Sequence, residues 1–537
     1  MSLVQTASSL AKSTCFPCRR SKRRCDRSQP TCQLCIRKGT SCSYPTHRGQ
    51  RQPSSLYGHE TSWNIVPTPD DSETNSSPPP QTEQASSGSN SPSSIVAAIR
   101  FMAPDVFREA QLETSRLNTA IPSDVAAYVG DSRQIRDMAI TFFSSSASWM
   151  PIICRKQFFG TVLNPLSPPR LELVLLFLCM KLFCTPLPSD VGDGQTTLYA
   201  TTKRFCSEVE ATGVMSIRVL QAALLIASYE TGHAIYPAAY FTVGACARYG
   251  TAIGSDKLMT DHIGDGKLGQ SWIEIEEMRR AWWGVLILDR LLNLGCPSRC
   301  LATRDPEFDN YLPVDDQPFF SAMTKPEDAV SISAGFSLKI GIFARIAQAT
   351  YLISQVLQTL GSTQFQYKAE SIARLEKNTT QLRRTLGALV QATEEEVSIR
   401  ELAFCCQAAI CYCGILLLQD HYWQLLDIRS TQDAYDNMFP ETRPALDVLW
   451  LMASGLRNEI AQGVIPDNKF TIFLMQIVYQ AASITITIGQ GNPDEASKEK
   501  IDTFKWLLQH MRARWRVAGV YLTILNVHEA VLTSKTL

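Results

Sequence analysis

The sequence predicts a small metal-folded unit at the N-terminus, joined by a disordered linker to a large all-α domain. Three observations support this prediction. Six cysteines recur at regular spacing within residues 15–42, residues 52–94 are rich in Ser and Pro, and apolar residues recur every three or four positions from about residue 95. The chain has 537 residues, of which 45 % are hydrophobic, so it is long enough for two or three folded units.

The charge of the chain is unevenly distributed, although the formal net charge is zero. Residues 1–51 contain eleven Lys and Arg but only one acid, Asp26, and the rest of the chain carries the balancing excess of acids. A basic unit attached to a mildly acidic body indicates a polyanion as the partner of the basic unit.

The cysteines of the first unit form one pattern written twice, C-x2-C-x6-C, at Cys15, Cys18, Cys25 and again at Cys32, Cys35, Cys42. A C-x2-C pair places two thiolates where both can bind one tetrahedral zinc ion. Two tetrahedral zinc ions need eight zinc–sulfur bonds, so six thiolates can supply them only if two thiolates bridge both ions. The symmetry of the repeat indicates that the bridging residues are Cys15 and Cys32, the first cysteine of each half. One ion would then bind Cys15, Cys18, Cys25 and Cys32, and the other Cys15, Cys32, Cys35 and Cys42. The alternatives are free thiols or disulfides, and disulfides are disfavoured inside a cell.

The segment "CFPCRRSKRRC" (15–25) resembles the fungal Zn(2)-C6 binuclear zinc cluster of transcription factors. Arg19 and Lys22 occupy the basic positions of that motif, and Pro30 matches its inter-half proline. The resemblance implies that a short metal-held helix enters the major groove of double-stranded DNA. It also implies that Lys22 reads a CGG-like triplet, and that phosphates are contacted by Arg19, Arg20, Arg23, Arg24 and Arg27, with Arg37 and Lys38 in support. A nuclear-import role for the same basic run is compatible with this interpretation.

The segment after the basic unit, residues 52–94, contains five acids and no Lys or Arg, as in "SETNSSPPPQTEQASSGSNSPSS". Such a composition cannot bury enough apolar surface to offset chain entropy, so we expect a disordered linker. Residues 43–94 contain no a/d heptads, which leaves open whether the protein is a monomer or a homodimer formed through its helical domain.

The rest of the chain, residues 95–537, is predicted to form an all-helical domain. The helical spacing is found in residues 171–184, 219–229, 273–294, 335–360, 401–425, 444–461 and 469–489. Ser167 is the expected N-cap of the first of these. The apolar run 171–184 is too short to span a bilayer, and no secretory signal is visible, so we expect no membrane partner.

The segment 276–316 resembles the fungal-specific transcription factor domain, as do 148–159 and 220–250 more loosely. The resemblance implies a regulatory domain that binds a co-regulator or a small-molecule effector. Trp282, Trp283, Leu286 and Leu288 are expected in the core. Asp289 and Arg290 either contact an effector or form a structural ion pair, and we favour the ion pair.

No catalytic constellation is present, so the chain is not expected to be an enzyme. "CCQAAICYC" (405–413) could suggest a second metal, but Cys406 and Cys413 would lie about 10 Å apart on a helix. Buried thiols are the better interpretation.

The sequence therefore predicts a nuclear, zinc-dependent, sequence-specific DNA-binding transcription factor for RNA polymerase II genes. A pathway-specific regulator of a secondary-metabolite or catabolic gene cluster is the favoured role. The alternative is a co-regulator or metabolite-sensing interaction protein with weak DNA reading. Target genes, sign of regulation and half-site spacing stay open.

Overall fold

The computed structural model describes residues 11, 13–20, 23–37, 42–44, 92–110, 112, 120–145, 149–162, 170–187, 194–260, 271–336, 340–362, 369–400, 406–426, 442–465, 470–489 and 493–536. Internal contacts divide the chain into two compact units, Met1–Ser87 and Gly88–Leu537. Of the predicted linker 52–94, only residues 92–94 lie within the described part, where they begin a helix.

The first unit contains two short helices, α1 (Phe16–Arg20) and α2 (Gln33–Arg37). Its buried side chains are mainly sulfur, because Cys15, Cys18, Cys25, Cys32 and Cys35 form the whole of its buried cluster. Leu34, Cys42 and Tyr44 pack against this cluster. So small an apolar interior cannot hold a fold by burial alone, which agrees with a metal-dependent unit.

Within the described residues, the regular secondary structure of the second unit is helical, and the one β contact there is a single bridge between Tyr311 and Ser331. The predicted fold class is therefore confirmed. Its first helices are α3 (Pro92–Met102), α4 (Pro104–Glu109), α5 (Ser123–Val129), α6 (Ser132–Ser145), α7 (Arg155–Gln157) with a π-helical turn η1 (Phe158–Val162), α8 (Leu171–Cys184), α9 (Thr197–Ala211), α10 (Ile217–Gly232), α11 (Ala238–Ile253), η2 (Lys257–Met259) and α12 (Trp272–Asn293).

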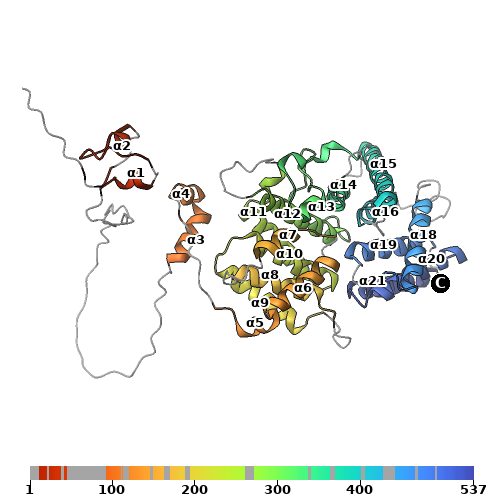
Figure 1. The fold of residues 1–537 in the computed structure, drawn as a ribbon. Coiled ribbons are helices and arrows are strands. Elements are labelled where there is room, and N and C mark those ends of the chain that lie inside the picture. The colour runs from red at the N-terminus through yellow and green to blue at the C-terminus, as the bar shows by residue number, and fades with distance from the viewer. Residues whose placement is uncertain are drawn as a thin grey trace, which may run out of the picture. The chain divides into compact units, whose positions relative to one another are not determined.

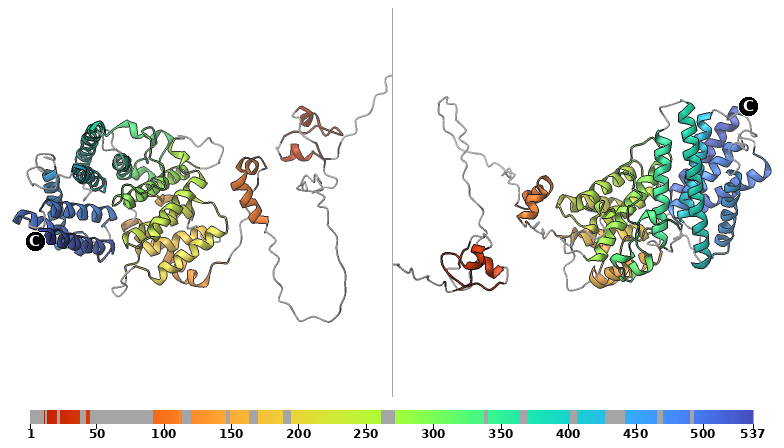
Figure 2. Two further views of the ribbon diagram at one scale, coloured as in Figure 1. Left: turned by 180° about the vertical axis from the view of Figure 1, so that it is seen from behind. Right: turned by 90° about the horizontal axis from the view of Figure 1, so that it is seen from above.

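The remaining helices form the second part of the same unit, coloured green to blue in Figure 1. They are α13 (Asp316–Phe320), η3 (Pro326–Asp328), η4 (Ile332–Ala334), α14 (Ile342–Ser362), α15 (Ala369–Arg400), α16 (Cys406–Leu426), α18 (Thr442–Ala461), α19 (Ile472–Ile488), α20 (Glu495–Met511) and α21 (Val517–Thr536). Each of the seven predicted helical segments overlaps a helix, but α14 starts seven residues after the predicted start at 335, and residues 401–405 of the segment 401–425 lie outside the described residues. Figure 2 shows α14, α15 and α16 side by side, in agreement with their mutual contacts.

Helices α8, α10 and α12 form the centre of the first part of the unit. α10 packs on α8, α11 and α12, and α12 also packs on α14, which connects the two parts. α8 and α10 are buried along nearly their whole length. α8 is apolar on nearly all faces, whereas α10 also buries Arg218, Gln221 and Glu230, which make hydrogen bonds. Trp282, Trp283, Leu286 and Leu288 are buried in the same continuous core, as predicted.

Helix starts follow the capping rules in some places and not in others. α12 begins with a capping box, in which the Ser271 hydroxyl accepts from the Glu274 N–H and the Glu274 carboxylate accepts from the Ser271 N–H. The N-cap position of α8 is Arg170, which makes no side-chain cap. The prediction of Ser167 as the cap of α8 is therefore wrong, because the helix starts at Leu171, as the apolar pattern predicted, and the two prolines that follow Ser167 precede it.

One segment in the described part of the chain, Val517–Ser534 in α21, is long and apolar enough to cross a membrane, and 17 % of it is buried. This is not the segment 171–184, whose α8 lies in the core. Length and composition alone do not assign α21 to a membrane, because its buried side packs on α19 and α20.

Candidate metal centre and nucleic-acid interface

The two halves of the cysteine pattern fold in the same way. Cys15 directly precedes α1 and Cys18 lies within it, while Cys32 directly precedes α2 and Cys35 lies within it. A short helix thus brings both cysteines of each C-x2-C pair to one side. The repeat seen in the sequence is therefore a structural repeat.

The sulfur atoms lie at distances suited to tetrahedral zinc. The Sγ of Cys15 lies 3.7 Å from that of Cys32, 3.7 Å from that of Cys25 and 3.8 Å from that of Cys35. Cys18 Sγ lies 3.7 Å from Cys32 Sγ. Four thiolates bound at about 2.3 Å around one ion would be about 3.8 Å apart, so these distances fit the edges of zinc tetrahedra.

Cys15 Sγ contacts sulfur from both halves of the repeat, namely Cys25 in its own half and Cys32 and Cys35 in the other. The Sγ–Sγ distance between Cys15 and Cys32 is among the shortest in the cluster, and both side chains are fully buried. Cys18 and Cys35, which belong to different ions in the predicted arrangement, are 4.0 Å apart. The sulfur atoms of Cys15, Cys18, Cys32 and Cys35 all lie within 4.8 Å of one another, so the assignment of Cys15 and Cys32 as the bridging ligands stays a prediction.

Backbone groups support the second half of the cluster. The Cys35 N–H donates to Cys32 Sγ, and the Cys32 N–H donates to Cys42 Sγ, each at 3.4 Å. Burial by itself raises the pKa of Cys32 and of Cys42. Hydrogen bonds from these N–H groups and from the neighbouring thiols outweigh burial, so the pKa of each thiol lies below its usual value. Burial dominates at Cys35 and raises its pKa to about 12. Zinc binds the thiolate form, so bound metal would offset the cost of deprotonating these buried thiols.

Asp26, the one acid in residues 1–51, links the first half of the cysteine repeat to the start of α2 in the second half. Its carboxylate accepts from the Gln33 N–H at the start of α2, with Oδ1 at 3.1 Å, and from the Ser28 hydroxyl at 2.7 Å. The Ser28 hydroxyl and the Gln33 N–H hold the pKa of Asp26 below its usual value. This contact was not predicted, because its partner lies seven residues away across a loop.

Tyr44 closes the unit at its C-terminal end. Its hydroxyl donates to the Ser28 carbonyl at 2.7 Å, and the neighbouring Ser43 carbonyl accepts from the Phe16 N–H at 2.9 Å. These bonds join the start of α1 and the loop after Cys25 to the segment after Cys42.

The predicted DNA contacts are only partly within the described residues. Arg23, Arg24 and Arg27 are exposed, and Arg27 has a φ of 64° in the loop between the halves. Arg19 and Arg20 lie on α1, although their side chains are outside the described part, as are Lys22 and Lys38. Arg37 ends α2 and is exposed. The cations that the structure describes are thus free to face a polyanion.

The helical unit resolves the two interpretations of Asp289 and Arg290. The Asp289 carboxylate accepts from Thr303, Ala302 and Arg290, and the Arg290 guanidinium also binds Ser354, Asp305 and the Arg304 carbonyl. Both side chains are almost fully buried. The pair fixes the loop after α12, so the structural interpretation is supported.

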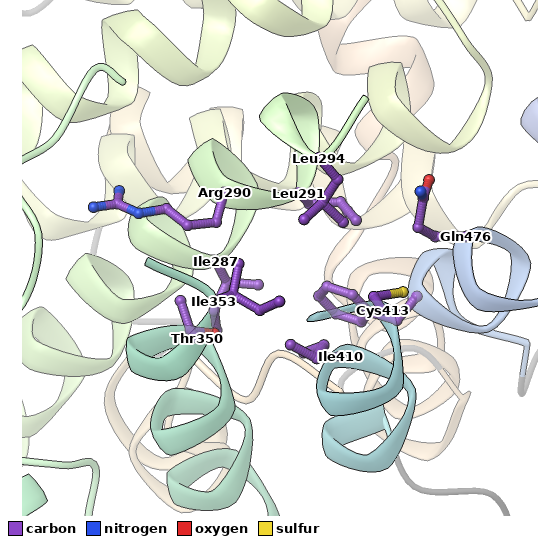
Figure 3. Close-up of a pocket in the computed structure, with 10 residues that line it drawn as sticks. Ile287, Arg290, Leu291, Leu294, Thr350, Ile353, Ile410, Cys413 and Gln476 are labelled. Atoms are coloured by element: carbon purple, nitrogen blue, oxygen red, sulfur yellow. The ribbon is translucent and has the colours of Figure 1, made fainter. Parts of the chain in front are cut away.

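A cavity next to this pair lies between α12, α14, α16 and α19 (Figure 3). Its volume is about 20 Å³ and its walls are mainly apolar, with Ile287, Leu291, Ile353 and Phe473 among them. Figure 3 shows the Arg290 guanidinium pointing away from Gln476 and Cys413. A cavity of this size holds about one water molecule, so a metabolite could enter only if the lining side chains moved.

The described cysteines of the group 405–413 are thiols in a core, and Cys405 lies outside the described residues. Cys406, Cys411 and Cys413 are buried, and burial raises the pKa of Cys406 to about 11. Metal-binding groups within the described residues are found only among the cysteines of the first unit and the adjacent Asp26.

Comparison with known proteins agrees with this geometry. Residues 13–51 match the Fungal Zn(2)-Cys(6) binuclear cluster domain, and residues 139–391 match the Fungal specific transcription factor domain. Over 163 residues the chain is 36 % identical to Transcription factor BOA15 of Botryotinia fuckeliana (strain B05.10), covering 30 % of this chain and 86 % of that protein.

Two further relatives are more distant. The chain is 28 % identical over 216 residues to Transcription factor tazR of Aspergillus terreus (strain NIH 2624 / FGSC A1156), covering 37 % of this chain and 33 % of that protein. It is 23 % identical over 294 residues to the Azaphilone cluster-specific transcription factor azaR of Aspergillus niger (strain ATCC 1015), covering 52 % of this chain and 57 % of that protein. The chain therefore spans about a third to a little over half of these two relatives.

The sulfur cluster and the helical unit thus define a zinc-cluster transcription factor. The chain belongs to the fungal Zn(2)-Cys(6) transcription factor family, whose cluster holds two zinc ions with six cysteines. The family and these relatives are transcription factors and not enzymes, as the sequence predicted.

Proposed function

We propose that Cys15, Cys18, Cys25 and Cys32 hold one zinc ion, and that Cys15, Cys32, Cys35 and Cys42 hold the second. The Sγ–Sγ distances of 3.7–3.8 Å around Cys15 carry this proposal. The zinc ions supply a rigid centre that fixes the direction of α1 and α2. Structural zinc contributes about 10–16 kcal/mol in small metal-folded peptides, far more than this unit's burial could supply.

The first unit reads double-stranded DNA through α1 and the residues after it. Lys22 donates to guanine in a CGG-like triplet, and Arg19, Arg20, Arg23, Arg24 and Arg27 neutralise phosphates. Three features support this role. Arg23, Arg24 and Arg27 are exposed, and the run of cations is dense. The carboxylate of Asp26 is bound to the Gln33 N–H. About five phosphate contacts give a slope of log K against log salt of roughly −4 to −5.

The protein acts in the nucleus as a pathway-specific regulator of a secondary-metabolite gene cluster. The name of the Aspergillus niger relative, a cluster-specific transcription factor, favours this over a catabolic cluster. The alternative, a metabolite-sensing protein with weak DNA reading, has less support. The cavity beside Arg290 is only about 20 Å³, and Asp289 and Arg290 are already bound to protein groups.

The test combines a metal count with selection of DNA sites by the full-length protein. Native mass spectrometry of zinc-loaded protein should show two zinc ions, and selection from a random duplex pool should enrich a CGG-like triplet. Cys18→Ala should lose both. The matched control is Cys300→Ala, which removes an exposed thiol of the helical unit and should keep both.

Two further variants separate base reading from phosphate binding. Lys22→Ala should weaken the preference for the triplet by about 10-fold or more. Arg24→Ala should weaken binding to all sequences alike and reduce the salt slope by about one. Unchanged affinity for target promoters in both variants would favour the metabolite-sensing alternative.

A further inference from the structure

The loop that follows α12 carries two accessible thiols, Cys296 and Cys300, in the segment "GCPSRC" (295–300). Both are free thiols, and Cys300 is exposed while Cys296 is partly exposed. Apart from Cys184, the other described cysteines of the helical unit are buried. An oxidant in solution therefore reaches Cys296 and Cys300 more readily than it reaches the thiols of the core.

Both ends of this loop are bound to one residue of α12. The Asn293 side chain donates to the Asp289 carbonyl at 2.6 Å, and the Ala302 N–H donates to the Asp289 carboxylate at 3.1 Å. Residues 294–301 therefore leave α12 and return to it along a short closed path. Because the two thiols are confined to this path, little chain entropy is lost when they are brought together.

A turn inside the loop brings the two cysteines close to each other. The Arg299 N–H donates to the Cys296 carbonyl at 3.0 Å. A bond between the first and fourth residues of a turn holds their Cα atoms within about 7 Å, and Cys300 is the next residue along the chain. A disulfide needs a Cα–Cα distance of about 4.4–6.8 Å. Because Ser298 and Arg299 are exposed, a small movement of this turn lets the two sulfur atoms meet without disturbing the core.

We propose that Cys296 and Cys300 are a redox-active dithiol, which a peroxide oxidises to a disulfide within the loop. The sulfur of the exposed Cys300 attacks one oxygen of the peroxide, and the O–O bond breaks. Cys300 becomes a sulfenic acid, while the other oxygen leaves with the thiol proton as water or an alcohol. The Cys296 sulfur then attacks the Cys300 sulfur, so that an S–S bond forms and the S–O bond breaks. The hydroxyl leaves as water with the Cys296 proton, and the two electrons lost by the thiols are gained by the peroxide.

The position of this disulfide is suited to a reversible signal. In the reducing interior of a cell, disulfides are rare and usually transient, and an exposed bond stays accessible to reductants. The Cys300 carbonyl accepts from the Tyr240 hydroxyl of α11 at 3.5 Å. The disulfide would tie this backbone group to the turn at the end of α12, so oxidation stiffens the connection between α11 and α12. This inference goes beyond the proposed function and does not depend on DNA reading.

The test is peptide mass spectrometry of the full-length, zinc-loaded protein after treatment with hydrogen peroxide and blocking of the remaining free thiols. Trypsin cleaves after Arg290, Arg299 and Arg304, so it separates the two cysteines onto the peptides 291–299 and 300–304. The expected result is a linked pair of these peptides, two hydrogen atoms lighter than their sum, which dithiothreitol separates. Neither peptide contains a cysteine of the first unit, so oxidation there does not affect the readout.

Three variants assign the reaction to the two thiols. Cys296→Ser should leave Cys300 as a sulfenic acid, which dimedone traps, and Cys300→Ser should abolish the linked pair. The matched control is Cys184→Ser, which removes the other partly exposed thiol described in the helical unit and should leave the linked pair unchanged.

Several outcomes would overturn the proposal. Sulfinic or sulfonic acid on Cys300 without the linked pair would mean that the two sulfur atoms do not meet. A disulfide between two copies of the chain, seen on a nonreducing gel and lost in Cys300→Ser, would assign this thiol to a reaction between molecules. Retention of both free thiols, at peroxide concentrations that oxidise a short peptide with one cysteine, would show that the pair is not redox-active.

Discussion

Thr303 donates both its backbone N–H, at 3.0 Å, and its hydroxyl, at 2.8 Å, to one carboxylate oxygen of Asp289. Asp289 is 2 % exposed and also accepts from the Arg290 guanidinium at 3.0 Å. The carboxylate therefore holds the loop after α12 against the helix and neutralises a buried cation. The burial and pairing of Asp289 and Arg290 are therefore explained by contacts within the protein, without a ligand.

Asp289→Ala should lower the free energy of unfolding of the helical unit by about 3–5 kcal/mol, because it leaves the Arg290 guanidinium buried without this charge partner. Asp289→Asn keeps part of the hydrogen bonding and should cost less. Chemical denaturation of the full-length protein, followed by far-UV circular dichroism, measures both. Normal stability combined with an altered transcriptional response would restore the effector interpretation.

Gly232→Ala should destabilise the protein by about 1–3 kcal/mol through overpacking. A Cβ at Gly232, the last residue of α10, would lie 2.2 Å from Cε3 of the Trp515 ring. The control is Gly244→Ala on α11, where a Cβ meets nothing within 4 Å, so the substitution should be neutral or stabilising. The melting temperatures of the two variants should therefore move apart. Equal shifts would mean that Trp515 can be displaced at little cost.

His233 should make the helical unit less stable in acid. Burial, followed by the charges of Arg514 and Arg516, lowers the pKa of His233 to about 3, and the ring lies between Tyr229 and Trp515. The unfolded chain takes up a proton near the ordinary pKa of about 6.5, whereas the folded chain does not until about pH 3. Stability is therefore complete above about pH 6.5 and falls as the pH drops, by about 2 kcal/mol at pH 5.

The measurement is the free energy of unfolding between pH 5 and 7.5 for the unaltered protein and for His233→Phe, which should show a shallower decline. His510→Gln, at a partly exposed position stacked on Trp506, is the control. A slope that is the same in His233→Phe and in the unaltered protein would assign the acid sensitivity to other groups.

Removal of zinc with a strong chelator should unfold the first unit and leave the helical unit intact. The first unit has little buried side-chain material besides sulfur, whereas the helical unit has a continuous core of its own. DNA affinity should fall to the level of Cys18→Ala, while far-UV circular dichroism and the melting temperature should change little. A large loss of helix would contradict the independence of the two units.

The sequence predicted some features of this structure because they repeat or are periodic. The cysteine positions follow from spacing, and the long helices α8, α10 and α12 follow from apolar periodicity. The half-exposed helix α21 has no such one-sided pattern, because its exposed and buried sides are both apolar, so it was missed. Other contacts could not be predicted because they join residues that are not neighbours in the sequence. They are the contact of Asp26 with the start of α2, the contact of Arg280 with Phe319, in which the guanidinium lies 3.9 Å from the ring centroid, and the packing of Trp515 on Gly232. Lys22 lies outside the described residues, so its role stays a prediction.

The closure of the helical unit by its last helices has a consequence for synthesis on the ribosome. The Arg514 guanidinium donates to the Phe183 carbonyl 331 residues earlier in the chain, and the Trp515 ring packs against Phe183 with centroids 5.5 Å apart. The ends of α8 and α10 around Phe183 and His233, which Trp515 covers, therefore stay uncovered until nearly the whole protein has been translated. A nascent chain would expose these side chains to chaperones for most of its synthesis, and a premature stop before residue 512 would release a product in which they stay uncovered.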